Sequence, residues 1–341
     1  MILSRRRMSL VAVWMMTLVL CGSRAAGQDA AAGLRVAPDH DNGVYASGEK
    51  VQFVVTGAED EASYEVQLNG AKMIDSGKVQ FKKGKAAIAC GLKEPGWLMV
   101  TVTAAGGATA KAGAAVDPFK IKPSLPAPND FDKFWDAQKK KLAAVPMNAR
   151  LTPVEEERKV NYGPEVVCFD VQLDCLGDKP ASGYYCRPKD AKRKSLPAFL
   201  SLHSAGIRGS SQQAAWMRAK QNMLGLDLNA HGLPNGKPAE FYNGLTNGEL
   251  RGYASKGIDS PETFYFLGMY LQIVRAIDFL TSQPEWDGKT VIVGGSSQGG
   301  GQSLVAAGID PRVTELQASV PAFCDQTGFV LDRKPGWPGT R

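Results

Sequence analysis

The sequence predicts an α/β domain with a doubly wound, mostly parallel sheet over residues 119–341, preceded by a small all-β sandwich over residues 28–118. Three observations support this prediction. Short β-branched segments separated by turn residues fill the first part of the chain. Apolar runs of strand length alternate with helical periodicity in the second part. A glycine-rich turn at residues 290–301 then joins a strand to a helix.

Residues 1–27 have the pattern of a secretory signal peptide. Residues 5–7 are a positive n-region, residues 8–20 an apolar segment, and residues 23–27 a small-residue stretch suited to cleavage. The apolar run is short for a membrane span, so export with cleavage is favoured over an uncleaved anchor. We therefore expect a secreted or periplasmic protein that has no membrane segment after cleavage.

The composition is that of a soluble globular protein, with 44% hydrophobic and 22% charged residues. Residues 1–27 hold four arginines and no acidic residue, so their removal lowers the formal charge from +6 to +2. The remaining charges of both signs are interspersed, which gives no reason to expect nucleic acid as a partner. Five cysteines remain at irregular spacing and predict neither a zinc site nor a disulfide framework, although one bridge from Cys168 or Cys175 to Cys186 stays open.

The all-β part contains segments that alternate in polarity or are rich in β-branched residues, at 51–55, 63–68 and 97–103. Turn pairs such as Asn69-Gly70 separate them. This spacing is typical of an immunoglobulin-like sandwich. Its role stays open between a structural or oligomerising module, which would make the protein a homo-oligomer, and a carbohydrate-binding module.

The second part follows a proline-rich connector at residues 122–129. The expected elements are a helix at 130–142, a β-hairpin at 166–173 and 182–186, strands at 197–203, 223–229 and 291–293, a helix at 263–280, a helix after Ser297, and an apolar run at 316–320. Strands that alternate with helices in this way predict the doubly wound sheet.

The most informative motif is Gly295-Ser296-Ser297-Gln298-Gly299, which lies between the last of these strands and a helix. A Gly-x-Ser-x-Gly serine in a strand–turn–helix setting is the nucleophile elbow of serine hydrolases. The alternative is a glycine-rich turn that only packs tightly or holds a phosphate. No lysine follows as a Walker loop requires, so we favour the nucleophile.

Several segments in order along the chain then resemble one family. They are the helix start at 131–135, His203, and residues 275–280, 294–300 and 310–313. The resemblance is to carbohydrate esterase family seven, the acetyl xylan esterases and cephalosporin C deacetylases, and it covers roughly residues 119–330. It implies an α/β-hydrolase fold, no cofactor, and a serine carboxylesterase that removes acetyl groups from xylan, other acetylated saccharides or small acetyl esters.

The resemblance also suggests roles for individual residues. Ser297 is the expected nucleophile, and the backbone N–H groups of Gln298 and Ala205 are the expected oxyanion hole. His203 ends the strand at 197–203, where it either braces the oxyanion loop or acts as the base, and the bracing role is favoured. His231 lies in the loop after the next strand, where it either fixes the turn or contacts substrate. The chain has His203-Ser204-Ala205 and Asn229-Ala230-His231-Gly232 where the family usually has His-Gly-Tyr and Arg-Gly-Gln. No residue cluster predicts a metal site.

The triad partners of Ser297 are the missing part of this pattern. In α/β hydrolases the acid and then the histidine follow the nucleophile, yet none of the 44 residues after Ser297 is a histidine. Asp310 and Asp325 come too early to be the acid. The sequence-based expectation is thus a hydrolase that is incomplete at its C-terminus, lacks the triad acid and histidine, and is weak or inactive as this chain. Two alternatives are a non-catalytic carbohydrate-binding or scaffold protein and a serine peptidase of the prolyl-oligopeptidase type.

Overall fold

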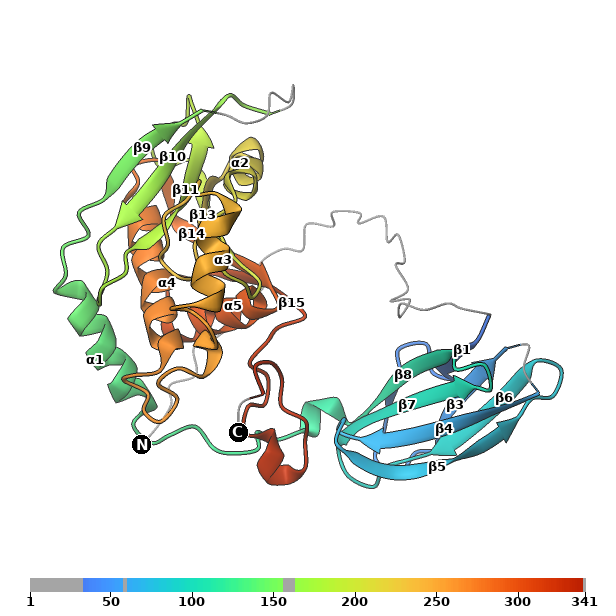
Figure 1. Ribbon diagram of the computed structural model, residues 1–341. Helices are drawn as coiled ribbons and strands as arrows, with labels where there is room; N and C mark the ends of the chain where they lie inside the picture. Colours follow the sequence, from blue (N-terminus) through green and yellow to red (C-terminus); the bar gives the residue numbers. More distant parts are fainter. Residues whose placement is uncertain (1–32, 58–59, 156–162, 340–341) are drawn as a thin grey trace. The chain divides into compact units, whose positions relative to one another are not determined.

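The computed structural model describes residues 33–57, 60–155 and 163–339 (Figure 1). The chain forms two compact units that divide between Ile121 and Lys122, a few residues beyond the boundary expected at 118. The expected signal peptide at residues 1–27 lies outside the described residues. None of the helices in the described part of the chain has the length and apolar character that crossing a membrane requires.

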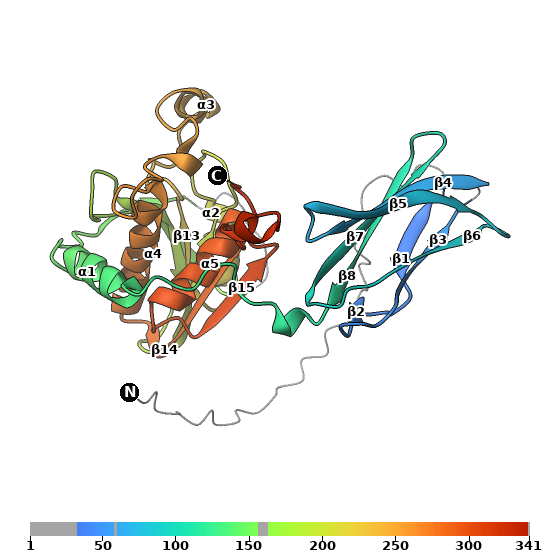
Figure 2. The ribbon, with the colours of Figure 1, turned by 90° about the horizontal axis from the view of Figure 1, so that it is seen from below.

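The first unit consists of two sheets. Its strands are β1 (Arg35–Pro38), β2 (Val44–Tyr45), β3 (Val51–Thr56), β4 (Glu61–Leu68), β5 (Lys72–Gln80), β6 (Lys85–Cys90), β7 (Gly96–Ala104) and β8 (Thr109–Val116), followed by the short helix η1 (Pro118–Lys120). The sheets have the strand orders β1-β3-β6 and β2-β8-β7-β4-β5 (Figure 2). Alternate residues of β3 and β7 are buried, and their inward side chains form one core that includes Phe53 and Val100.

The second unit contains one mixed sheet with the order β15-β14-β12-β13-β11-β10-β9. These strands are β9 (Arg150–Val154), β10 (Val166–Leu173), β11 (Ala181–Pro188), β12 (Leu196–Leu202), β13 (Leu224–Leu228), β14 (Trp286–Ser296) and β15 (Glu315–Ser319). Strands β12, β13, β14 and β15 are parallel to one another. Strands β11, β10 and β9 each pair with their neighbours in the antiparallel direction. All side chains of β13 are buried, as expected of a central strand covered on both faces.

Helices cover both faces of this sheet. They are α1 (Phe131–Ala143), α2 (Gln212–Lys220), α3 (Ala239–Asn247), α4 (Tyr265–Ser282) and α5 (Gln298–Ile309), with short helices η2 (Tyr253–Ser255) and η3 (Gly328–Leu331). Helix α4 packs on the face that carries Val171 and Tyr185, and α2 on the opposite face, which carries Cys168 and Cys186. Helix α5 packs against α4, β14 and β15.

The expected β-hairpin is present, and a disulfide crosses it. Cys168 of β10 lies directly opposite Cys186 of β11, and the two sulfurs are bonded. Cys175, the other partner considered from the sequence, is a buried free thiol.

Candidate active site

Ser297 lies at a sharp turn between the end of β14 and the start of α5, as a nucleophile elbow requires. Its backbone has φ 53° and ψ −119°, a conformation that a non-glycine residue rarely adopts. Glycine is needed on both sides, because a Cβ at Gly295 or Gly299 would lie within 3 Å of the carbonyl oxygen of Leu202. The neighbouring strand β12 thus approaches the turn as closely as backbone allows.

The elbow is held from its other side by β15 and the turn after it. The Ser297 N–H donates to the carbonyl oxygen of Ser319 over 3.0 Å, and the Ala322 N–H donates to the carbonyl oxygen of Ser297 over 2.9 Å. These bonds fix the strained backbone while leaving the Ser297 side chain only partly buried. A half-buried hydroxyl on a rigid turn suits a nucleophile.

Gln298 is the first residue of α5. At this position a backbone N–H has no acceptor within the helix, and the positive end of the helix dipole lies here. Its side chain is fully buried and its Oε1 accepts a 2.6 Å hydrogen bond from the hydroxyl of Tyr253. The side chain therefore anchors the helix start. The backbone amide is the group that can stabilise an oxyanion.

The loop after β12 runs beside the elbow. Ser204 Oγ donates to the carbonyl oxygen of Ser296 over 3.1 Å, which links the loop to the residue before the nucleophile. The guanidinium of Arg208 folds back onto the carbonyl oxygens of Ser204 and Ala205. The structure thus brings the Ala205 loop and Ser297 into one region, and the role of the Ala205 amide as an oxyanion donor stays a prediction.

His203 is buried at the end of β12, and its Nε2 bonds to the carboxylate of Asp227 on β13. The same carboxylate oxygen accepts a 2.7 Å hydrogen bond from the Ser211 N–H at the far end of the loop. His203 and Asp227 together tie both ends of the loop to the sheet. This arrangement favours the bracing role over that of a base.

His231 is also buried, and both of its ring nitrogens are engaged. Nδ1 lies 2.9 Å from the hydroxyl of Tyr265, and Nε2 lies 3.2 Å from the carbonyl oxygen of Gly206. A carbonyl oxygen can only accept, so Nε2 carries the proton and Nδ1 accepts from the tyrosine. Burial lowers the pKa of His231 to about 4, so the ring is neutral at pH 7.

Sequence reasoning missed three polar residues that shape this region. Tyr253 binds the Gln298 side chain and packs edge-on against the His231 ring, with centroids 4.6 Å apart. Asn229 accepts from the N–H of His231 and donates to the carbonyl oxygen of Arg208. Asp227 orients His203. No motif marks these residues, although Asn229 opens the loop at 229–232 that departs from the family pattern.

Asp310 and Asp325, the two aspartates considered above for the triad acid, have structural partners. Buried Asp310 pairs with Arg312, which also pairs with Asp278, and these carboxylates raise the pKa of the guanidinium. Asp325 binds Ser124 and Arg333. Within the described residues, no group of three or more histidine, cysteine or acidic side chains could hold a metal ion.

Comparison with known proteins adds independent findings. The acetyl xylan esterase family matches residues 118–331. Acetyl esterase Axe7A from Xylanibacter ruminicola is 32% identical over 311 residues, which are 88% of this chain and 70% of that protein. The structure of an acetyl xylan esterase from Paenibacillus sp. R4 aligns with a TM-score of 0.52 and 27% identity, over 63% of this chain and 66% of its own. Acetyl xylan esterase 1 from Thermoanaerobacterium sp. JW/SL YS485 aligns with a TM-score of 0.49 and 23% identity, over 62% of this chain and 64% of its own. The chain thus spans less than two thirds of the length of these two structures.

Proposed function

This chain belongs to the acetyl xylan esterase family, and we propose that Ser297 is the nucleophile with which it removes acetyl groups from saccharides. Family membership confirms the resemblance drawn from the sequence and identifies a serine esterase with the α/β-hydrolase fold. It favours an esterase over the peptidase and scaffold alternatives. The observation that carries the assignment of Ser297 is its strained backbone between β14 and α5.

The chemistry follows from the groups around the elbow. The Ser297 Oγ attacks the acetyl carbonyl carbon, and the oxyanion that forms accepts hydrogen bonds from the N–H groups of Gln298 and Ala205. The sugar alcohol leaves with a proton and an acetyl-serine forms. Water then attacks this ester, one of its protons passes to the Ser297 oxygen, and acetic acid leaves and ionises to acetate. Each oxyanion donor lowers the barrier by about 3–4 kcal/mol.

Among the described residues, this arrangement lacks an evident general base to accept the Ser297 proton. The chain has three histidines. His203 bonds to Asp227, and His231 uses both ring nitrogens for Tyr265 and Gly206. His40 of the first unit bonds to its own neighbours Val44 and Glu49. We therefore propose that the 341-residue polypeptide hydrolyses acetyl esters slowly, with the oxyanion groups supplying most of the rate enhancement.

Acetate release from p-nitrophenyl acetate and from acetylated xylo-oligosaccharides tests this proposal. We expect slow release that is lost in Ser297→Ala and kept in Ser296→Ala, a matched change at the exposed neighbouring residue. A fluorophosphonate should label Ser297, as located by peptide mass spectrometry. Acetate release that is unchanged in Ser297→Ala would exclude Ser297 as the nucleophile. Fast release by the native chain would contradict the slow rate that we propose and would require a base, for which His203 and His231 are the candidates.

We also propose that the protein is exported. The disulfide between Cys168 and Cys186 supports this, because such bonds persist in oxidising compartments. Expression of the full sequence in a bacterial host, followed by N-terminal sequencing, is the test. We expect a periplasmic or secreted product that starts near residue 26 or 28, and an uncleaved cytosolic product would contradict the proposal.

A further inference from the structure

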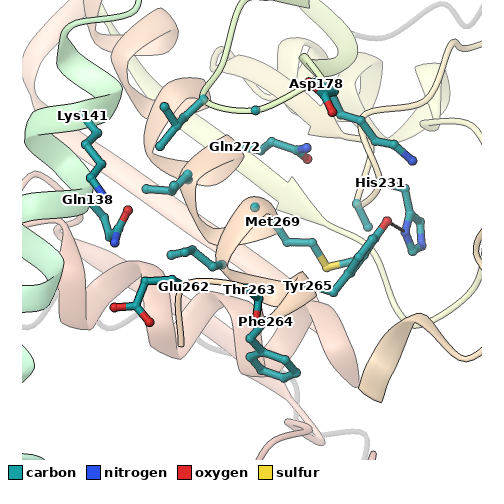
Figure 3. A pocket seen from close by; sticks show the side chains of 17 residues that line it. Gln138, Lys141, Asp178, His231, Glu262, Thr263, Phe264, Tyr265, Met269 and Gln272 are labelled. Carbon is teal, nitrogen blue, oxygen red and sulfur yellow. Dashed lines mark hydrogen bonds between the residues drawn. The ribbon is translucent and has the colours of Figure 1, made fainter. Parts of the chain in front are cut away.

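A cavity of about 770 Å³ opens between α1, the loop that joins β10 to β11, and the first half of α4 (Figure 3). Its size is within the range of small-molecule binding sites. Ser297 does not line it. The cavity is therefore separate from the nucleophile, and the esterase mechanism gives it no role.

Two buried amide side chains line this cavity from different helices, Gln138 on α1 and Gln272 on α4 (Figure 3). Gln272 is only 6% exposed, and its Oε1 has no hydrogen-bond partner within the described residues. A buried acceptor left unpaired costs about 1–3 kcal/mol, so such a group is expected to serve a purpose. An amide both donates and accepts, which matches the hydrogen-bonding capacity of a hydroxyl group.

The charged groups of the cavity wall balance one another. Lys141 and Lys179 contribute two positive charges, and Asp178 and Glu262 contribute two negative charges. His231 adds none, because burial lowers its pKa to about 4. A net field that is close to neutral favours an uncharged polar ligand over an anion or a cation.

Much of the rest of the wall is apolar. Leu267, Met269 and Leu271 of α4 and Leu176 of the β10–β11 loop line it between the amides. A sugar ring presents hydroxyl groups at its rim and C–H groups on its faces, so it can use both kinds of wall. We propose that this cavity binds a neutral polyhydroxylated ligand of one or two sugar rings.

One wall of the cavity also contacts the helix that follows the nucleophile elbow. The sulfur of Met269 lies 3.9 Å from the side-chain nitrogen of Gln298 and 3.6 Å from that of Gln302. His231, which also lines the cavity, donates from Nε2 to the carbonyl oxygen of Gly206 in the oxyanion loop. A bound sugar would thus contact residues that support the active site without reaching Ser297.

Binding of methyl β-D-xyloside and xylobiose tests this proposal, measured by calorimetry and saturation-transfer NMR. The Ser297→Ala protein is used throughout, so the result does not depend on turnover. Gln272→Met keeps the side-chain volume but removes the amide, and Lys141→Met changes an exposed residue at the rim. Gln283→Met, at the end of the same helix and outside the cavity, is the matched control.

We expect saturable binding that weakens about tenfold in Gln272→Met, weakens less in Lys141→Met, and is unchanged in Gln283→Met. Circular dichroism tests whether each variant is folded. If the Gln272 variant does not fold, weaker binding by the Lys141 variant is the result that tests whether the sugar binds in this cavity. Absence of saturable binding would overturn the proposal. Binding that both cavity variants leave unchanged would also overturn it, as would a preference for glucuronate or glucosamine over the xyloside.

Discussion

The hydroxyl of Tyr253 lies at the meeting point of the groups that form the candidate oxyanion hole. It donates to Gln298 at the start of α5, and its ring packs against His231, which binds the carbonyl oxygen of Gly206. One side chain on the short helix η2 therefore contacts Gln298 directly and is linked to the oxyanion loop through His231. Burial raises the pKa of Tyr253, so the phenol keeps its proton and acts as the donor.

Replacement of Tyr253 by phenylalanine should lower the free energy of unfolding more than the same replacement of another buried tyrosine. Tyr253→Phe leaves the Gln298 Oε1 without a donor, and we expect the free energy of unfolding to fall by about 1–3 kcal/mol. Tyr185→Phe is the control, because the buried Tyr185 hydroxyl has no partner among the described residues. That variant should be as stable as the native protein or slightly more stable. Urea unfolding measures both, and equal losses would contradict the assignment of the Tyr253 hydrogen bond.

His231 should make the second unit sensitive to acid. The unfolded ring binds a proton below about pH 6.5, whereas the folded ring stays neutral until about pH 4. Its stabilising contribution is therefore complete above pH 6.5 and is lost as the pH falls through this interval. At pH 5 the loss is about 2 kcal/mol.

Urea unfolding of the native protein and of His231→Gln between pH 7.5 and pH 4.5 checks this expectation. Glutamine can still donate to Gly206 but does not titrate. The native protein should lose stability more steeply than the variant as the pH falls. Parallel curves for the two proteins would show that His231 is not held neutral by the fold.

At the scale of the elements, the elbow depends on how closely β12 approaches α5. A Cβ at Gly299 would collide with backbone atoms of Leu202 and His203, which cannot rotate away. We expect Gly299→Ala to destabilise the protein by about 1–3 kcal/mol or more. In the same helix a Cβ at Gly308 meets nothing within 4 Å. Gly308→Ala should stabilise by up to about 1 kcal/mol, because alanine is the better helix former. Thermal unfolding of both variants gives the comparison, and shifts of the same sign would contradict it.

The disulfide is the second feature at this scale. It joins two cysteines that are 18 positions apart on adjacent antiparallel strands. We expect the double variant Cys168→Ala/Cys186→Ala to lose about 3 kcal/mol of stability. Cys175→Ala, which removes a buried free thiol, is the control for lost packing. Urea unfolding that gives the same loss for both would show that the bond adds nothing beyond packing.

Elements with a clear local pattern could be predicted from the sequence. Strands β3, β4 and β7 alternate in burial, and α4 is long enough for its apolar period to repeat, so each was expected near its observed position. Strand β5 is mostly exposed and carries no such signal. Helices α2 and α3 have nine residues each, too few for a helical period to stand out. Strand β15 is apolar in part, yet its side chains are mostly exposed.

In the site, too, residues within a local motif could be predicted from the sequence, whereas residues that act through distant contacts could not. Ser297 and Gln298 belong to a contiguous motif whose geometry depends on local backbone, so the sequence was sufficient for them. Tyr253 and Asp227 act through contacts with residues 45 and 24 positions away, respectively. Such contacts exist only after the sheet and the loops have assembled. A single sequence therefore gives no signal for them.

At the scale of the whole molecule, the two units have separate cores. The core cluster of the first unit is made of buried apolar residues between Leu34 and Val116, and it contains no residue of the second unit. A sandwich with its own core is expected to fold independently. We therefore expect a fragment of residues 28–121 to unfold cooperatively on heating.

Two phenylalanines within this fragment provide a matched test of its core. Phe53 is completely buried between the sheets, and Phe119 is fully exposed. Phe53→Ala should lower the free energy of unfolding by about 3–5 kcal/mol, because it removes a large side chain from a packed core and leaves a cavity. Phe119→Ala should change it by less than about 0.5 kcal/mol. Circular dichroism during thermal and urea unfolding measures both variants. A fragment without a cooperative transition would mean that the sandwich requires the second unit in order to fold, and equal effects of the two substitutions would contradict the core position of Phe53.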